Sequence, residues 1–439
     1  MALVQDWLAE AGWSLLRMLA NPFYYVGIVF VVLQYRREVA LERKLLHTRL
    51  HSIIGESWRT VLWGWAAGIA ASIAMAFVGA AVSFEALLWL WAIMFVLVWL
   101  RIRFLCLAYA VGIIGVLQAA AELLPQAALN SASVLQDAAN SLAAIELPPL
   151  LALVGALHLA EALLVRLQGH RMATPLFFEG KRGRAVGGYN LLGFWPVPLF
   201  LLVPLEGSGL TLPWQPLLMD GGATLGWGLV AFPVVIGFAD RTQSLLPRAK
   251  MRLVALRLSI YAPVVLLLAY AAYYWSLPLL SLAASVAVIA LHEALIAYGS
   301  REEERRSPLY VHDESGLKVL AVLPGSAAEA MGIAVGETIS KVNGERVRSK
   351  EEMHLAMRLN PAFCKLEVVN LAGHVKFVGS AVFADKHHQL GILLCPDEQA
   401  PYYVPEKQQA VPLPALLARR WFGVRRGGRG ETHTHTEEA

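Results

Sequence analysis

Nine long apolar runs before residue 300 constrain this chain more than any other feature. A transmembrane helix needs about 20 mostly apolar residues to cross the hydrocarbon core of a bilayer. Some runs are shorter, so we expect eight or nine transmembrane helices, which makes this part an all-α polytopic membrane domain. The runs cover residues 13–35, 60–82, 86–100, 104–123, 149–165, 189–203, 222–238, 258–275 and 279–298.

The overall composition agrees with a chain that lies mostly within a membrane. Hydrophobic residues make up 57% of the 439 residues, and charged residues make up only 16%. Soluble domains carry about 25% charged residues. Two local features disturb the apolar pattern. Asn21-Pro22 interrupts the first run, and three prolines, Pro196, Pro198 and Pro204, are expected to kink the sixth helix.

Basic residues alternate between loops along the chain. Every second loop is rich in Lys and Arg, whereas the loops at 83–85, 124–148, 204–221 and 276–278 contain neither. Cytoplasmic loops retain positive charge, because inserting Arg or Lys into the bilayer centre costs about 2.5–3.5 kcal/mol. This alternation places the N-terminus outside if all nine runs cross, and everything after residue 300 in the cytoplasm of a bacterial cell.

The chain changes character after a charged stretch. Short strands are expected at 316–323, 337–342, 365–370, 374–379 and 390–394, with a helix capped by Ser349 and a hairpin turn at Asn343-Gly344. This pattern predicts a small α+β domain. We expect a membrane domain at 1–300, a charged linker at 301–307, the small domain at 308–397, and a Pro-rich, then basic, partly disordered tail at 398–439.

The segment from Val322 to Val347 resembles the PDZ family. It contains Pro324-Gly-Ser, the small residues Ala327–Ala330, a Gly336-acidic-x-Ile step and Val342-Asn-Gly. PDZ domains bind extended peptides by adding a strand to a sheet edge. The loop that opens the receiving strand in that family is not found before Gly316. A similar loop occurs at the end of the domain, which implies a circularly permuted order.

The permuted order implies the position of a peptide groove. Its strand and opening loop would be formed by Leu390, Gly391, Ile392, Leu393 and Leu394. The facing helix would contribute Met353, Ala356 or Met357. The alternative is that residues 390–394 are simply a buried core strand.

A narrower resemblance covers the chain to about residue 397. Asn360, the run Cys364-Lys-Leu-Glu-Val and the closing His387-His-Gln-Leu-Gly-Ile-Leu are similar to the MinJ family, the cell-division topological determinants of Firmicutes. The opening Asn21-Pro-Phe-Tyr-Tyr is similar too. The resemblance implies a scaffold, enriched at septum and poles, that links the scaffold protein DivIVA to the membrane-bound ATPase MinD in division-site selection. It identifies no residues for either contact.

Two other functions are weighed against this scaffold. Site-2 type membrane proteases also combine membrane helices with PDZ domains, but their zinc motif His-Glu-x-x-His is incomplete here. Ile296 stands at the second ligand position after His292-Glu293, and Asp220 precedes this motif instead of following it. We therefore expect no catalytic residues, cofactor or metal, and a protease relationship would be regulatory or inactive.

The second alternative is a transporter with a PDZ regulator. It depends on the ionisable residues His158, Glu161, His292 and Glu293, because such residues within a membrane are functional candidates. Hydrogen bonding between helices is the simpler expectation. The basic loops already follow the topology rule, so they do not indicate nucleic-acid binding.

The tail carries a short basic and aromatic segment. Such a segment suits the anionic inner leaflet of a membrane, although a solvated tail is an equal expectation. Its candidate membrane-surface residues are Arg419, Arg420, Trp421, Phe422, Arg425 and Arg426.

Overall fold

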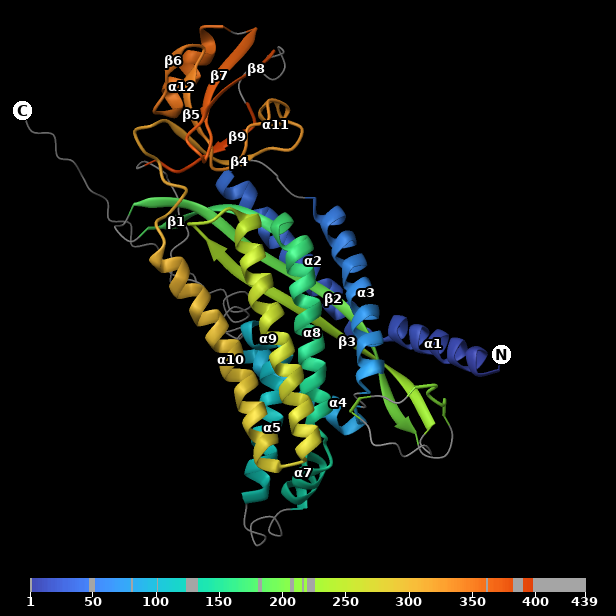
Figure 1. Ribbon diagram of the computed structural model, residues 1–439. Coiled ribbons are helices and arrows are strands. Elements are labelled where there is room, and N and C mark those ends of the chain that lie inside the picture. The colour runs from blue at the N-terminus through green and yellow to red at the C-terminus, as the bar shows by residue number, and fades with distance from the viewer. Residues whose placement is uncertain are drawn as a thin grey trace, which may run out of the picture.

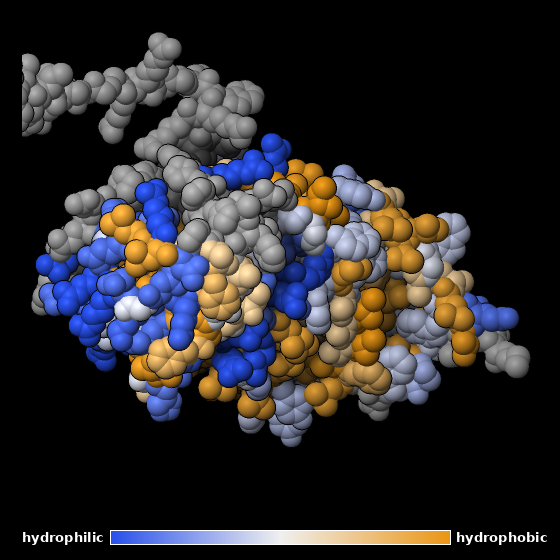
Figure 2. All heavy atoms as spheres, turned by 90° about the horizontal axis from the view of Figure 1, so that it is seen from above, coloured by the Kyte–Doolittle hydropathy of each residue, from blue (hydrophilic) through white to orange (hydrophobic). Residues whose placement is uncertain are grey.

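The structure is a computed structural model with a helical part and a small α+β domain at one end of it (Figure 1). It describes residues 2–46, 52–79, 82–100, 102–123, 133–180, 184–205, 209–214, 217–218, 226–360, 362–381 and 390–397. Seen from above, hydrophilic residues gather on one side and hydrophobic residues cover much of the other (Figure 2).

Long apolar helices form most of the first 300 residues. They are α1 (Ala2–Ala20), α2 (Pro22–Leu46), α3 (Ile53–Val78), α4 (Phe84–Leu100), α5 (Leu107–Leu123), α7 (Ser133–Ala143), α8 (Leu147–Gln168), α9 (Pro247–Trp275) and α10 (Pro278–Arg305). Two short 3-10 turns, η1 (Ile102–Leu105) and η2 (Gly169–Met172), precede α5 and follow α8.

Four of the described helices are long and apolar enough to cross a membrane, namely α3, α8 with its following turn, α9 and α10. A fifth crossing results if α1 and α2, which are bent by 54° at the Asn21 break, count as one span. The helices α4 and α5 have 17 residues each. The number of eight or nine transmembrane helices is therefore not confirmed.

Two of the predicted helices are strands, so the prediction of an all-α membrane domain is wrong for this part. The strands β1 (Ala173–Glu179), β2 (Ala185–Leu205) and β3 (Gly226–Thr242) form an antiparallel sheet in the order β1-β2-β3. The predicted run 189–203 lies within β2, and the described part of the run 222–238, residues 226–238, lies within β3. Proline removes a helical hydrogen bond and clashes with the preceding turn, and Pro196, Pro198 and Pro204 all lie within β2.

Helix α3 covers the edge of β2 beyond the residues that pair with β1. Proline has no N–H, so Pro196 and Pro198 leave no unsatisfied donor on this edge. Phe200 donates its backbone N–H to Ser72 Oγ at 2.8 Å. A Cβ added to Gly64 or Gly68 would overlap the carbonyl oxygen of Pro196 or Pro198. The two backbones therefore approach at positions where α3 has only hydrogen on Cα.

The spacing of these contacts has a geometric reason. Four helical residues advance about 6 Å, and two strand residues advance about 6.6 Å. The helix therefore places three residues in turn beside three alternate residues of the strand. These pairs are Gly64 with Pro196, Gly68 with Pro198, and Ser72 with Phe200. At the far end, Leu202 accepts a hydrogen bond from the Val82 N–H at 3.2 Å.

The other edge of the hairpin lies against α1. Ser14 Oγ donates to the Leu229 carbonyl oxygen at 3.0 Å, and the Leu229 N–H donates to Glu10 Oε1 at 3.4 Å. Open sheet edges are not tolerated when they face lipid, because their polar groups find no partner there. Side chains of α1 and α3 supply these partners.

Helix α8 is the most buried of the four helices long enough to cross a membrane. In its most apolar stretch, 61% of the residues are buried inside the protein. Leu150, Leu151, Leu153 and Val154 are almost inaccessible to solvent. Helix α10 continues to Arg305, so most of the stretch predicted as a linker is the last part of a helix.

The C-terminal domain contains β4 (Leu317–Val322), α11 (Ala327–Ala330), β5 (Thr338–Val342), β6 (Glu345–Arg346), α12 (Lys350–Arg358), β7 (Phe363–Val369), β8 (Val375–Ala381) and β9 (Ile392–Leu394). Its strands follow the order β8-β7-β5-β4-β9, with β6 paired to β5. Asn343 and Gly344 have φ angles of 51° and 94°. The predicted hairpin turn is thus confirmed, since such two-residue turns require positive φ.

Candidate functional site

The predicted groove strand β9 lies at the end of the sheet, paired antiparallel with β4. Leu390 and Leu394 are buried, and Ile392 is partly buried. They belong to the same hydrophobic cluster as Met353 and Ala356. All of these residues contribute to the core of the domain, so both the groove and the core-strand interpretation are compatible with this packing.

Helix α12 presents two different faces. Ser349 caps it by accepting the Glu352 N–H at 3.1 Å, as expected for a serine at this position. Met353 and Ala356 point into the domain core, and Met357 packs at its margin. Leu355 lies on the opposite face and is 62% exposed. Met357 is thus the candidate groove residue of α12 that is not fully buried.

Gly391 has a conformational reason to be glycine. Its φ is +76°, and a Cβ there would overlap the Ser326 side chain. The Leu323 N–H donates to the Gly391 carbonyl oxygen at 2.8 Å, which joins the end of β4 to the start of β9. Substitution of Gly391 would therefore disturb the fold as well as any groove.

The C-terminal domain is docked on the end of the first sheet, a contact that the sequence did not indicate. The Gly187 N–H donates to the Tyr310 carbonyl oxygen at 2.9 Å. The Leu309 N–H donates to the backbone carbonyl oxygen of Gln243 at 2.8 Å. Tyr189 also donates its hydroxyl to the Leu320 carbonyl oxygen. Tyr310, which precedes β4, is fully buried in this interface.

One predicted groove residue belongs to this interface. Leu393 packs against the core of the membrane part together with Leu320 and Cys395. Burial raises the pKa of the Cys395 thiol to about 12 and that of the Cys364 thiol to about 11. Both cysteines are therefore neutral thiols near pH 7, with little thiolate to react.

The intramembrane residues of the sequence analysis lie partly together. His158 of α8 and His292 of α10 have ring centroids 5.3 Å apart. Glu161 Oε2 lies 4.0 Å from His158 Nε2. Cys106, which the sequence did not single out, lies between the two histidines. No sequence signal could have found it, because the three residues come from separate segments.

Other predicted features lie outside the part of the chain that the structure describes. These are Asp220 of the incomplete protease motif and the tail residues Arg419, Arg420, Trp421, Phe422, Arg425 and Arg426.

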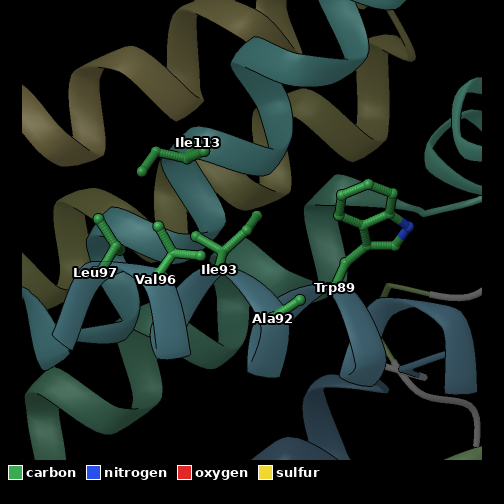
Figure 3. Close-up of a pocket in the computed structure, with 6 residues that line it drawn as sticks. All are labelled: Trp89, Ala92, Ile93, Val96, Leu97 and Ile113. Carbon is green, nitrogen blue, oxygen red and sulfur yellow. The ribbon is translucent and has the colours of Figure 1, made fainter. Parts of the chain in front are cut away.

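An apolar hollow of about 250 Å³ lies between α4 and α5, lined by Trp89, Ala92, Ile93, Val96, Leu97 and Ile113 (Figure 3). Its lining is almost entirely apolar and offers no acid, base or metal ligand. The hollow therefore indicates no chemistry.

The comparisons with known proteins agree with the fold. The PDZ domain family matches residues 299–369. Over 398 residues the chain is 27% identical to the cell division topological determinant MinJ of Bacillus subtilis (strain 168), covering 89% of this chain and 96% of that protein. It is 26% identical over 250 residues to a probable determinant of the same name from Lacticaseibacillus paracasei, covering 56% of this chain and 66% of that protein.

No solved structure matches this chain. The names of the relatives describe a role in cell division and no enzymatic activity. The long match to MinJ and the PDZ match in the C-terminal part confirm the resemblance seen in the sequence.

Proposed function

We propose that this protein is a non-enzymatic membrane scaffold that uses its PDZ domain to recruit partners in division-site selection. The resemblance to the MinJ family implies DivIVA and a MinD-like ATPase as these partners. The membrane part would hold the scaffold at septum and poles, and the PDZ domain would face the cytoplasm.

The observation that carries the proposal is the position of β9. In the described sheet it is an end strand, it follows a glycine turn, and its residues share a core with α12. A peptide that extends a sheet by strand addition pairs with such an end strand.

The strand order supports a circularly permuted PDZ domain. The strands β8 and β9 follow α12 in the chain, yet they pair with β7 and β4 at the two ends of the sheet. A permuted chain would place the peptide-receiving strand last, as β9. The family match ends at residue 369, before these strands, so the permuted order rests on the pairing alone.

In this proposal, the domain at 308–397 forms the binding module and the basic tail at 398–439 contacts the inner leaflet. A partner segment would pair with β9 and place an apolar side chain near Met357. Docking of the domain through Tyr310 and Leu393 keeps it at the membrane surface. A partner would then be recruited close to the bilayer instead of on a long tether.

The test is the localisation of a C-terminal fluorescent fusion in a dividing Gram-positive rod, with and without DivIVA. We expect septal and polar enrichment that becomes a uniform membrane signal without DivIVA. Met357→Glu places a charge beside the groove and should weaken partner binding by at least about tenfold, since an unpaired charge in an apolar site costs more than 1.4 kcal/mol.

Leu355→Glu is the matched control, because it adds the same charge to the same helix on its exposed face. It should leave partner binding and localisation unchanged. A uniform signal in both strains would contradict the division role. Equal binding by the two variants, both folded, would contradict the groove while leaving the scaffold function open.

A further inference from the structure

A thiol and two imidazoles converge where α5, α8 and α10 meet. Cys106 Sγ lies 3.3 Å from His158 Nε2 and 3.6 Å from His292 Nε2. The ligand atoms of all three residues lie within 4.8 Å of one another. His158 is only 2% exposed. Cys106 and His292 are partly buried, and the three residues come from segments far apart in the sequence.

The surrounding hydrogen bonds orient both imidazoles. His158 Nδ1 lies 2.8 Å from the Val154 carbonyl oxygen, which can only accept a hydrogen bond, so Nδ1 carries the proton. In neutral His158 the Nε2 lone pair then faces Cys106.

His292 is oriented in the same way. Tyr109 donates its hydroxyl to Glu293 Oε1 at 2.5 Å, so its oxygen is available to accept from His292 Nδ1 at 3.2 Å. This assigns the proton to Nδ1 and directs the Nε2 lone pair of His292 to Cys106. Metal-binding histidines are oriented by such outer hydrogen bonds to a carbonyl or a carboxylate network.

The distances match those of a tetrahedral zinc site. Zinc binds thiolate sulfur at about 2.3 Å and imidazole nitrogen at about 2.0 Å, so that sulfur and nitrogen ligands lie about 3.5 Å apart. The two sulfur–nitrogen distances here are 3.3 and 3.6 Å. A thiol has one proton to share between two imidazole nitrogens, whereas a metal ion binds the thiolate and both nitrogens at once.

Glu161, three residues after His158 on α8, lies beside this group of three ligands and offers a carboxylate oxygen as the fourth ligand. Its Oε2 lies 4.0 Å from His158 Nε2, and its side chain is 12% exposed. The Cys106 thiolate and the Glu161 carboxylate together carry two negative charges, which balance a divalent cation. Charge balance matters here, because a net charge within the bilayer is costly.

We propose that Cys106, His158, His292 and Glu161 form a structural zinc site that ties α5, α8 and α10 together within the membrane part. Zn²⁺ binding displaces the thiol proton of Cys106, and that proton leaves to solvent. The site does not depend on the scaffold function, because none of its residues belongs to the PDZ domain.

The test is the metal content of the full-length protein, purified in detergent through a tag without histidines. His433→Ala and His435→Ala are introduced into every sample, so that the tail histidines cannot contribute zinc. We expect about one zinc per chain, as for one mononuclear site. Cys106→Ser retains a hydrogen-bond donor of similar shape and should lower zinc at least about tenfold, since thiolate is the strongest zinc ligand of the set.

Cys364→Ser is the control, because Cys364 is buried in the PDZ core away from the cluster. It should retain full zinc. Replacement of zinc by Co²⁺ should produce a thiolate-to-cobalt charge-transfer band that Cys106→Ser abolishes and Cys364→Ser preserves.

Three outcomes would overturn the proposal. They are the absence of zinc from folded protein together with no cobalt band, stoichiometric copper or iron in its place, and full zinc in Cys106→Ser. A monodisperse size-exclusion profile for each variant shows that loss of zinc does not come from unfolding.

Discussion

Lys250 is a charged side chain that is only 2% exposed, at the end of the membrane part on which the PDZ domain rests. Its Nζ lies 3.1 Å from Asp240 Oδ2 in β3 and 3.2 Å from Glu303 Oε2 in α10. Glu303 also accepts the N–H groups of Gln243 and Ser244 at 2.8 and 2.9 Å. In the sequence, Lys250 is one of several basic residues in the loop between the apolar runs 222–238 and 258–275, which is predicted to be cytoplasmic. The structure gives it a bridging role between three elements.

Lys250→Met should lower the free energy of unfolding by about 3 kcal/mol, because removing one partner of a buried ion pair leaves the other charge uncompensated. Thermal unfolding in detergent measures the change. Arg252→Met, an exposed cation two residues away, should stay within about 0.5 kcal/mol of the parent.

The double variant Lys250→Met with Glu303→Gln separates charge from packing. It should recover part of the lost stability, since the unpaired carboxylate is then neutral. Equal unfolding temperatures for Lys250→Met and Arg252→Met would contradict the bridging role.

At the scale of elements, the β2–β3 hairpin takes the place of two expected helices. Hydropathy alone does not distinguish a long apolar strand from an apolar helix, and prolines in such a run are equally compatible with helix kinks that neighbouring helices accommodate. The decisive contacts come from α3, because Gly64, Gly68 and Ser72 let the helix approach and bond the strand edge. A lone hairpin without this cover would expose polar backbone to lipid.

Gly68→Ala tests this close approach. Alanine normally stabilises a helix by up to about 1 kcal/mol over glycine, but its Cβ here would overlap the Pro198 carbonyl oxygen. We expect a net loss of about 1–3 kcal/mol, as for other overpacked sites. Thermal unfolding in detergent measures the loss.

Gly55→Ala in the same helix is the control, because the nearest atoms to its Cβ would lie at 3.7 Å. It should be neutral or stabilising. A stabilised Gly68→Ala variant would mean that α3 and β2 do not approach as described.

At the scale of the whole molecule, the hairpin is compatible with the predicted alternation of loops. Two strands that cross the membrane in place of two helices would leave each following loop on the side that the basic residues predict. The contacts agree with this arrangement. Gly187 of β2 bonds Tyr310 beside the PDZ domain, whereas Leu202 bonds Val82 in the turn before α4. Helix α7 lies at the end of the molecule opposite the PDZ domain (Figure 1).

Asp137→Cys in α7 should therefore react with a membrane-impermeant maleimide added to intact cells. His354→Cys on the exposed surface of α12 should react only after the membrane is permeabilised. The native Cys364 and Cys395 are buried and contribute little background. Labelling of Asp137→Cys from the cytoplasm alone would overturn the topology.

The sequence by itself determined the features that depend on local chemistry. Apolar runs and basic loops indicated a membrane protein, Asn343-Gly344 and Ser349 marked a turn and a helix start, and the motif before Val347 identified the PDZ domain. Each of these signals lies within a few residues, where spacing and backbone preference suffice.

Tertiary structure alone decided the rest. The strand character of 185–205 depends on a partner strand and on α3, and the docking of the PDZ domain depends on Tyr310 meeting Gly187. The contact between Cys106 and His292 is formed by residues 186 positions apart in the chain. Such contacts depend on how helices and strands pack together, and no local pattern in the chain encodes that packing.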